Sequence, residues 1–269
     1  QSSSIKNLIS LKGRRALITG ATGGLGFQMA TTLSELGADL ILLDQPGSNY
    51  KNIIEAVNHI NDVSIETINC DLEDESSRSE TIKHILEQNL SLNILINNAA
   101  FTGTSNLQGW ATNLEEQTVA TWRRAIEVNL TAIFDFCKGL AETLRESGNA
   151  SIINVASIYG VVAPDYSIYE GTDIGNASAY AVSKGGLIQL TRWLSTTLAP
   201  EIRVNSISPG GILRNNLPES FVEAYEKKTP LSRMAKDEDF KGITAFLASD
   251  LSEYVTGQNI LVDGGWTVW

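Results

Sequence analysis

Histidine and cysteine are scarce in this chain of 269 residues. The two histidines, His59 and His84, fall in polar stretches of expected helix, which leaves little material for a histidine-based metal site or a Ser-His-Asp triad. The two cysteines, Cys70 and Cys137, lie far apart in apolar surroundings, and no signal peptide is apparent. We therefore expect no metal ion, no disulfide and a reduced, cytoplasmic protein, although a targeting segment upstream of Gln1 stays open.

Long apolar runs and an excess of basic side chains are also missing. No segment approaches the roughly 18 apolar residues of a membrane helix. Acidic residues number 31 against 20 basic ones, and the resulting formal charge of −11 repels nucleic-acid phosphates and acidic lipids. Because the chain has no Pro- or Ser-rich linker, internal repeat or low-complexity run, residues 1–269 should form one domain that binds neither membrane nor nucleic acid.

What is present is an alternation of short β-rich apolar segments with helical sequence. Such alternation is typical of parallel strands joined by right-handed crossovers. We therefore predict a Rossmann-type, doubly wound α/β fold, with helices on both faces of one seven-stranded parallel sheet. The expected strands are 16–19, 39–43, 63–70, 92–96, 150–155, 202–207 and 259–262, and the expected helices are 27–37, 52–60, 73–88, 118–145, 178–198 and 237–248.

A glycine-rich segment, T-G-A-T-G-G-L-G at 19–26, lies between the first expected strand and the first expected helix. In this context the glycines allow a tight turn and close approach of the backbone to a pyrophosphate, and the helix amino terminus favours the anion. A plain glycine-rich turn is the alternative. The predicted dinucleotide-binding residues of this segment are Gly20, Thr22, Gly23, Gly24, Leu25 and Gly26.

Asp44 ends the second expected strand, where an acidic residue can hydrogen-bond the adenosine ribose of a dinucleotide. Its carboxylate would repel a 2′-phosphate, and no Arg or Lys lies in the glycine segment or closely follows Asp44. These charges predict NAD in preference to NADP, the alternative being an aspartate that opens a turn before Pro46. Asp71 and Leu72 follow the third strand, where Asp71 either contacts the adenine or caps the next helix.

Tyr180 and Lys184 lie four residues apart on an expected helix, so they share one face. An adjacent ammonium favours the phenolate, and this would bring the pKa of Tyr180 down from about 10 to a value useful for an acid/base. Taken alone, such a pair is more often an ordinary feature of a helix surface.

Further motifs follow in order along the chain. N-N-A-A stands at 97–100, V-N-L contains Asn129, I-I-N-V-A-S ends at Ser157, Tyr180 and Lys184 form Y-x-x-x-K, P-G stands at 209–210 and V-D-G-G at 262–265. Together with the glycine segment, they make residues 11–265 resemble the single-domain branch of the short-chain dehydrogenase/reductase family. Within that family, the chain resembles members associated with flagellin or surface-sugar modification pathways.

The resemblance implies a catalytic tetrad and hydride transfer between NAD and a secondary alcohol or ketone. Tyr180 would be the acid/base, and Ser157 would donate a hydrogen bond to the substrate oxygen. Lys184 would also hold the nicotinamide ribose, and Asn129 would position a water in the proton relay. Besides Tyr180 and Lys184, the implied cofactor contacts are Asn98, Ala99, Ala100, Pro209, Gly210 and Ile212.

Three features depart from the family pattern. Ala100 replaces the usual glycine, and Arg214 stands where many members carry a threonine that contacts the carboxamide. The segment between Ser157 and Tyr180 is longer than the family commonly has, so an extended loop precedes the catalytic helix.

Three loops, at about 101–113, 160–177 and 210–233, should surround the substrate at the carboxyl end of the sheet. Their side chains predict a polar pocket with a few aromatic faces, suited to a sugar-like substrate. Arg214 either meets a phosphate or carboxylate of that substrate or is solvated. The predicted substrate residues are Phe101, Tyr166, Tyr169 and Arg214.

The resemblance also implies association into homotetramers or homodimers through long helices. Ile133, Phe136, Leu140 and Leu144 would supply one such face, unless this stripe belongs to the core. Three competing functions remain open: a non-catalytic dinucleotide sensor, an NADP-dependent ketone reductase, and an epimerase or dehydratase, for which the chain lacks room for the usual extra substrate domain.

Overall fold

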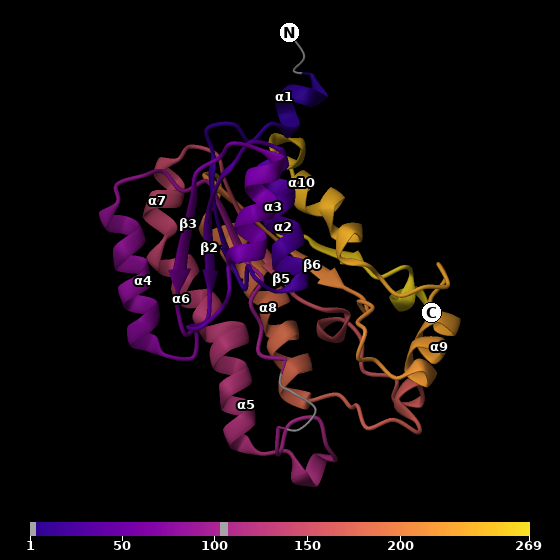
Figure 1. Cartoon of the computed structure of the whole chain (residues 1–269). Helices are drawn as coiled ribbons and strands as arrows, with labels where there is room; N and C mark the ends of the chain where they lie inside the picture. The colour runs from indigo at the N-terminus through magenta and orange to yellow at the C-terminus, as the bar shows by residue number, and fades with distance from the viewer. Residues whose placement is uncertain (1–3, 103–106) are drawn as a thin grey trace.

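Seven parallel strands form one sheet in the computed structural model, which describes residues 4–102 and 107–269 (Figure 1). Their order is β3, β2, β1, β4, β5, β6, β7, and every neighbouring pair is parallel. The predicted sheet is thus confirmed, and its order reverses between β1 and β4, where open α/β sheets bind ligands. The strands are β1 (Arg15–Thr19), β2 (Asp39–Asp44), β3 (Ile65–Asn69), β4 (Ile94–Asn97), β5 (Ala150–Val155), β6 (Ile202–Pro209) and β7 (Asn259–Val262).

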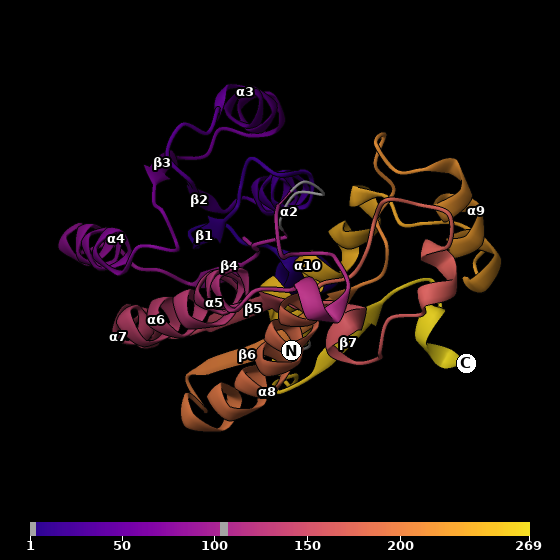
Figure 2. The same ribbon diagram turned by 90° about the horizontal axis from the view of Figure 1, so that it is seen from below.

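Helical layers cover both faces of the sheet (Figure 2). Successive residues of a strand point to opposite faces, so Ile18 packs in one core cluster and Leu17 in the other. The layer on the Ile18 side contains α2 (Gly24–Glu35), α3 (Lys51–Ile60) and α10 (Lys241–Ala248). The layer on the Leu17 side contains α4 (Glu75–Glu87), α6 (Ala132–Gly139) and α8 (Ser178–Thr197).

The long helix expected across 118–145 is divided into shorter pieces. It consists of α5 (Val119–Ile126), a π-helical turn η2 (Glu127–Thr131), α6, and α7 (Ala141–Glu146). The wider π turn includes Asn129, which is fully buried. Single π turns within helices often occur at functional sites because they redirect a side chain.

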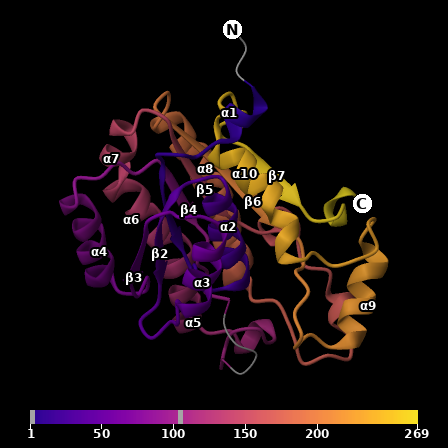
Figure 3. The same cartoon turned by 45° about the horizontal axis from the view of Figure 1, so that its top comes forward.

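Two helices lie outside the sequence prediction. The short α1 (Ile5–Ile9) is capped by Ser4, whose hydroxyl accepts from the Asn7 N–H, and it lies beside η6 (Asp250–Ser252), as Figure 3 shows. α9 (Glu219–Lys228) forms within the expected loop 210–233. The remaining short turns are η1 (Leu114–Glu116), η3 (Ile158–Gly160), η4 (Tyr166–Tyr169), η5 (Asp237–Phe240) and η7 (Trp266–Val268).

The apolar stripe on the expected long helix is core, as the alternative held. Ile133, Phe136, Leu140 and Leu144 are at most 4% exposed and pack against the sheet. The suggestion that they form a face between subunits is therefore wrong. Among the described residues, no helix has the length and apolar character needed to cross a bilayer.

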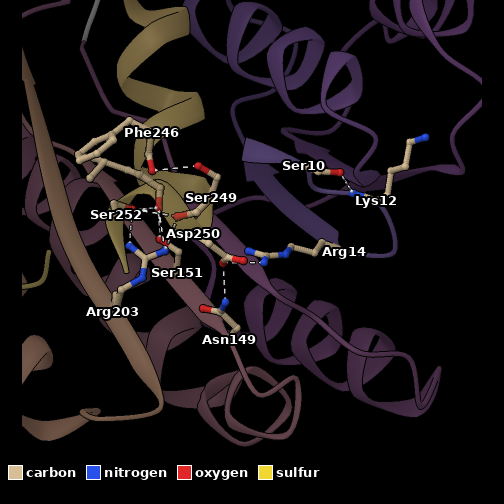
Figure 4. A network of polar contacts seen from close by, with 11 residues as sticks. Ser10, Lys12, Arg14, Asn149, Ser151, Arg203, Phe246, Ser249, Asp250 and Ser252 are labelled. Carbon is tan, nitrogen blue, oxygen red and sulfur yellow. Dashed lines mark hydrogen bonds and ion pairs between the residues drawn. The ribbon is translucent and has the colours of Figure 1, made fainter. Parts of the chain in front are cut away.

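A polar network ties the amino-terminal edge of the sheet to the segment after α10 (Figure 4). Asp250 accepts from Arg14 at 2.6 Å and from Asn149 at 2.5 Å. Arg203 on β6 donates to the Ser252 hydroxyl at 2.7 Å, and burial lowers its pKa to about 10. Since all these residues lie at the edge opposite the strand ends that bind ligands, we interpret the network as structural.

Candidate functional site

A cavity of about 700 Å³ opens where β1, β2, β3 and β4 end. Arg124 and Arg214 also line it, together with Phe101. The predicted cofactor residues found in its lining are Gly20, Thr22, Gly23, Gly24, Leu25, Gly26, Asp44, Asp71, Leu72, Asn98, Ala99 and Ala100.

The glycine segment has no room for side chains at its key positions. Gly20 has φ +65°, and a Cβ there would lie 2.9 Å from the Ala99 Cα. A Cβ on Gly26 would lie 2.1 Å from the Gly20 carbonyl oxygen. The N-cap of the following helix α2 is Gly23, which has no side chain to accept a hydrogen bond from the amino-terminal N–H groups of the helix. These residues fit the pyrophosphate of a dinucleotide.

Asn98 and Thr19 fix this turn to the neighbouring strand. The Asn98 side chain donates to the carbonyl oxygens of Thr19 and Gly20 at 3.0 and 3.1 Å. The Thr19 hydroxyl accepts from the backbone N–H groups of Asn98 and Ala99, both at 3.0 Å. The shape of the glycine segment is therefore set by side chains from β1 and the end of β4.

Asp44 lies at the rim of the same cavity. One carboxylate oxygen accepts from the Thr22 N–H and hydroxyl at 2.9 and 2.8 Å. The other accepts from the Gln45 N–H at 2.8 Å and the Ser48 hydroxyl at 3.2 Å. The carboxylate thus braces the glycine segment and carries a negative charge where a ribose or a 2′-phosphate would lie.

Asp71 lines the cavity and does not cap α4, so its contact with the adenine stays a prediction. Its carboxylate accepts from the Glu73 N–H at 2.9 Å in the turn that leads to α4, while Asp74 is the N-cap of that helix. The hydrogen bond of Asp71 stabilises a local turn, and that of Asp74 caps the helix.

A second cavity, of about 240 Å³, contains the Ser157 and Tyr180 side chains. Tyr180, Pro209, Gly210 and Ile212, predicted as cofactor residues, line this cavity and not the larger one. The rest of its lining is Ile158, Tyr159, Tyr169, Gly211, Leu217, Phe221, Tyr225 and Met234.

Burial governs the charges of Tyr180 and Lys184. Lys184 is 1% exposed, donates to the Val155 carbonyl oxygen at 2.7 Å, and lies 5.7 Å from the Tyr180 ring centroid. Burial lowers the pKa of Lys184 to about 7. The pKa of Tyr180 is raised, mainly by burial, and the hydrogen bond with Ser157 only partly opposes this rise. The predicted lowering of the Tyr180 pKa is therefore wrong for this arrangement, since loss of hydration outweighs the nearby lysine.

Asn129 joins the end of β4 to α8. Its side-chain oxygen accepts from the Phe101 N–H at 2.6 Å. Its side-chain nitrogen donates to the Phe101 carbonyl oxygen at 3.2 Å and to the Ser183 hydroxyl at 3.1 Å. The side chain that the resemblance assigns to a proton relay is thus engaged by three protein groups.

Comparison with known proteins identifies the family. The family model described as Enoyl-(Acyl carrier protein) reductase matches residues 20–267. The crystal structure of a short-chain type dehydrogenase/reductase from Mycobacterium marinum superimposes with a TM-score of 0.85 and 27% identity, over 98% of this chain and 99% of that one. The chain belongs to the short-chain dehydrogenase/reductase family. It is therefore an oxidoreductase that uses a nicotinamide cofactor.

Two relatives whose names state a substrate have a similarly low sequence identity to this chain. The NADP-dependent mannitol dehydrogenase of Alternaria alternata is 27% identical over 100% of this chain and 97% of that protein. The cis-4-hydroxycyclohexanecarboxylate dehydrogenase of Sinomonas cyclohexanicum is 31% identical over 94% of this chain and 96% of that protein. Both relatives match along nearly their full length.

The smaller cavity of this dehydrogenase/reductase is more aromatic than the sequence predicts. The Tyr159 and Tyr169 hydroxyls are 2.5 Å apart, and burial raises the pKa of both. Tyr225 stacks on Trp266 with 4.2 Å between ring centroids, and its hydroxyl accepts from the Gly211 N–H at 2.6 Å. The pocket is therefore bounded mostly by apolar surface, with tyrosine hydroxyls as its main polar groups besides Ser157.

The four predicted substrate residues separate in space. Tyr169 lines the smaller cavity, but Tyr166 is 65% exposed and lines neither cavity. Phe101 and Arg214 line the larger one. Of the four predicted substrate residues, Tyr169 alone therefore lines the small cavity together with Ser157 and Tyr180. Part of the first predicted substrate loop, residues 103–106, lies outside the described residues.

Several residues of the site escape sequence reasoning. Tyr159 follows Ser157 by two residues and could have been noted as a strand-end neighbour. Phe221 and Tyr225 could not, because they lie on α9, for which no helix was expected. Arg214 is paired with Asp237, at the start of η5, and no spacing rule links these two positions.

Proposed function

We propose that this dehydrogenase/reductase transfers a hydride between NAD and a secondary alcohol or ketone of a small, hydroxylated, sugar-like compound. The observation that carries the proposal is the presence of Ser157 and the Tyr180 ring in one small cavity, with the Lys184 ammonium 5.7 Å from that ring. These are the oxygen-binding group and the acid/base that a carbonyl needs as it gains or loses a hydride.

Each side chain of the proposed site has its own role in the reaction. The nicotinamide, when bound, supplies the carbon that accepts or donates the hydride. Ser157 holds the substrate oxygen by a hydrogen bond, and Tyr180 takes the hydroxyl proton during oxidation or returns it during reduction. Lys184, when protonated, stabilises the phenolate form of Tyr180. Asn129 positions the Phe101 backbone against α8 through its three hydrogen bonds.

The raised pKa of Tyr180 suits one half of this cycle. Because burial favours the neutral phenol, Tyr180 enters reduction with its proton in place and can donate it to the developing alkoxide. Oxidation needs the phenolate, and it depends on the charge of Lys184, whose pKa of about 7 makes that charge sensitive to small changes near neutrality.

The preference for NAD is supported by the charge at the rim of the large cavity. The Asp44 carboxylate would lie near the adenosine ribose and would repel a 2′-phosphate. An NADP-dependent ketone reductase is the second candidate, because the mannitol dehydrogenase relative is NADP-dependent.

The substrate class is supported by the size and lining of the small cavity. At about 240 Å³, it falls just below the roughly 300–1,000 Å³ of common ligand pockets, so a single compact ring is favoured. Such a ring can place its C–H faces on the tyrosine and phenylalanine rings and its hydroxyls on the Tyr159 and Tyr169 pair. The relatives that act on mannitol and on a hydroxycyclohexanecarboxylate are consistent with compact hydroxylated compounds.

The proposal is tested by following nicotinamide absorbance with a panel of cyclic alcohols, polyols, monosaccharides and their ketones, with NAD and NADP in parallel. We expect turnover of a compact hydroxylated ring, with higher kcat/KM for NAD. No hydride transfer across the panel, despite dinucleotide binding, would favour the non-catalytic sensor. A higher kcat/KM for NADP would favour the second candidate.

The setting and assembly of the enzyme belong to the same proposal. Two free, buried thiols, Cys70 and Cys137, are consistent with a location in the reducing cytoplasm.

We also propose that the protein forms homodimers or homotetramers, supported by exposed apolar side chains on α6 and α8. These are Phe134, at 43% exposure, and Val182 and Trp193, at 51% and 54%.

A further inference from the structure

Arg214 lies at the large cavity and is held there by a bidentate ion pair. Its Nη1 and Nη2 donate to the two carboxylate oxygens of Asp237 at 2.9 and 2.7 Å. Nη1 also donates to the Leu213 carbonyl oxygen at 3.1 Å. Asp237 begins η5, and η5 packs against α2. The pair therefore connects the loop after β6 to the helix that follows the glycine segment.

Gly24 shows how close the guanidinium lies to the amino terminus of α2. A Cβ on Gly24 would be 3.1 Å from Arg214 Nη2 and 2.8 Å from the Asp237 carboxylate. Gly24 is the first residue of α2, and no acidic side chain lies in its first turn. An anion held by the N–H groups of that turn would lie within reach of Arg214.

The pairing with Asp237 leaves part of the guanidinium available. A guanidinium has five N–H groups, of which three are used by the bonds to Asp237 and Leu213. The Nε group and one Nη2 hydrogen have no acceptor among the residues that the structure describes, and the Arg214 side chain is 41% exposed. Two-point pairing with a carboxylate also fixes the plane of the guanidinium, and so the direction of its remaining donors.

We propose that Arg214 is the phosphate-binding side chain of this site and donates its remaining N–H groups to the pyrophosphate of the bound dinucleotide. Asp237 acts as the positioning residue that orients it. The inference rests on the proposed dinucleotide site and adds a guanidinium to a glycine segment that contains no basic side chain. Arg124 also lines the cavity, but it donates through Nε to Glu73 and lies over the Phe101 ring. Arg214 is the arginine that lies beside Gly24 at the amino terminus of α2.

The test compares ADP with adenosine as probes, using titration calorimetry on the whole protein. The two probes share base and ribose, and only ADP carries the diphosphate. For Arg214→Gln we expect the Kd of ADP and of NAD to rise roughly tenfold or more, as for loss of a charge-assisted hydrogen bond, while the Kd of adenosine stays within twofold of wild type. An unchanged melting temperature would show that the variant is folded.

Arg233→Gln is the matched control. Arg233 pairs with Asp239 in the same two-point manner at 2.6 and 2.8 Å and is 46% exposed, but it lines a separate cavity. This variant should leave ADP affinity unchanged. Near wild-type ADP affinity in Arg214→Gln, or an equal loss of ADP and adenosine, would overturn the assignment. If the wild-type protein bound neither ADP nor NAD, the proposed dinucleotide site itself would be overturned. This outcome is measured on the wild type alone, so it is distinct from a failure of the Arg214 assignment.

Discussion

Asp44 combines a structural and an electrostatic task at the rim of the large cavity. Its four hydrogen bonds hold the glycine segment to the end of β2, and its charge faces the position of the adenosine ribose. The proposed preference for NAD over NADP therefore depends on the charge of this carboxylate.

Replacing Asp44 with Ala should relax this discrimination. Without the carboxylate, a 2′-phosphate meets less repulsion, and we expect the kcat/KM ratio of NADP to NAD to rise about tenfold or more. Asp71→Ala is the control, since Asp71 lines the same cavity but caps a local turn. An unaltered cofactor preference in Asp44→Ala would count against the repulsion argument.

Lys184 should make stability depend on pH. Its pKa falls from the ordinary 10.5 to about 7 on folding, so between these values the unfolded chain holds a proton that the folded protein has lost. Stability relative to Lys184→Met therefore rises with pH through this window and is flat below it.

Urea unfolding at pH 6 and pH 9 measures the effect. We expect the free energy of unfolding of wild type, relative to Lys184→Met, to increase by ~3 kcal/mol from pH 6 to pH 9. The same difference at both pH values would show that the pKa of Lys184 is not lowered in the folded protein.

At the scale of elements, the loop between η3 and α8 carries much of the proposed specificity. It supplies Tyr169, whose hydroxyl lies 2.5 Å from that of Tyr159 in the small cavity, and Tyr166, which projects to solvent. In Figure 1 this loop lies beside α9, and Tyr169 packs against Phe221 of that helix with 5.4 Å between ring centroids. The loop and α9 thus form one wall of the pocket.

Tyr169→Phe should weaken substrate binding more than turnover. Loss of one hydroxyl from the pair should raise KM for a hydroxylated ring by about 3- to 10-fold, with kcat little changed. Tyr166→Phe alters the same loop at its exposed residue and should change neither constant. Equal kinetics in the two variants would remove the tyrosine pair from substrate recognition.

Some elements of this fold could be predicted from the sequence and others could not. The sheet and the glycine segment could be predicted because short apolar runs alternate with helical sequence and because the glycines at 19–26 stand between a strand and a helix. α9 and the π turn at Asn129 could not, because tertiary packing decides them. The lining of the small cavity depends on tertiary packing in the same way, because α9 places Phe221 and Tyr225 in it. Arg214 forms an ion pair with Asp237 and does not line this cavity.

For the whole molecule, the exposed apolar side chains of α6 and α8 are the proposed contacts between subunits. Trp193→Glu should therefore reduce the molar mass measured by light scattering, because a buried, unpaired carboxylate is costly at an interface. Ile5→Glu, on the 72% exposed position of α1, should leave it unchanged. An unaltered mass in Trp193→Glu would place any association elsewhere.

The central claim is that Tyr180 moves the proton in a hydride-transfer reaction, and Tyr180→Phe tests it most directly. Removal of the hydroxyl deletes the acid/base but leaves the large cavity intact. We predict that kcat falls about 10²- to 10⁴-fold while the Kd for NAD, measured by calorimetry, stays within a few-fold of wild type. Wild-type turnover by Tyr180→Phe would contradict the account.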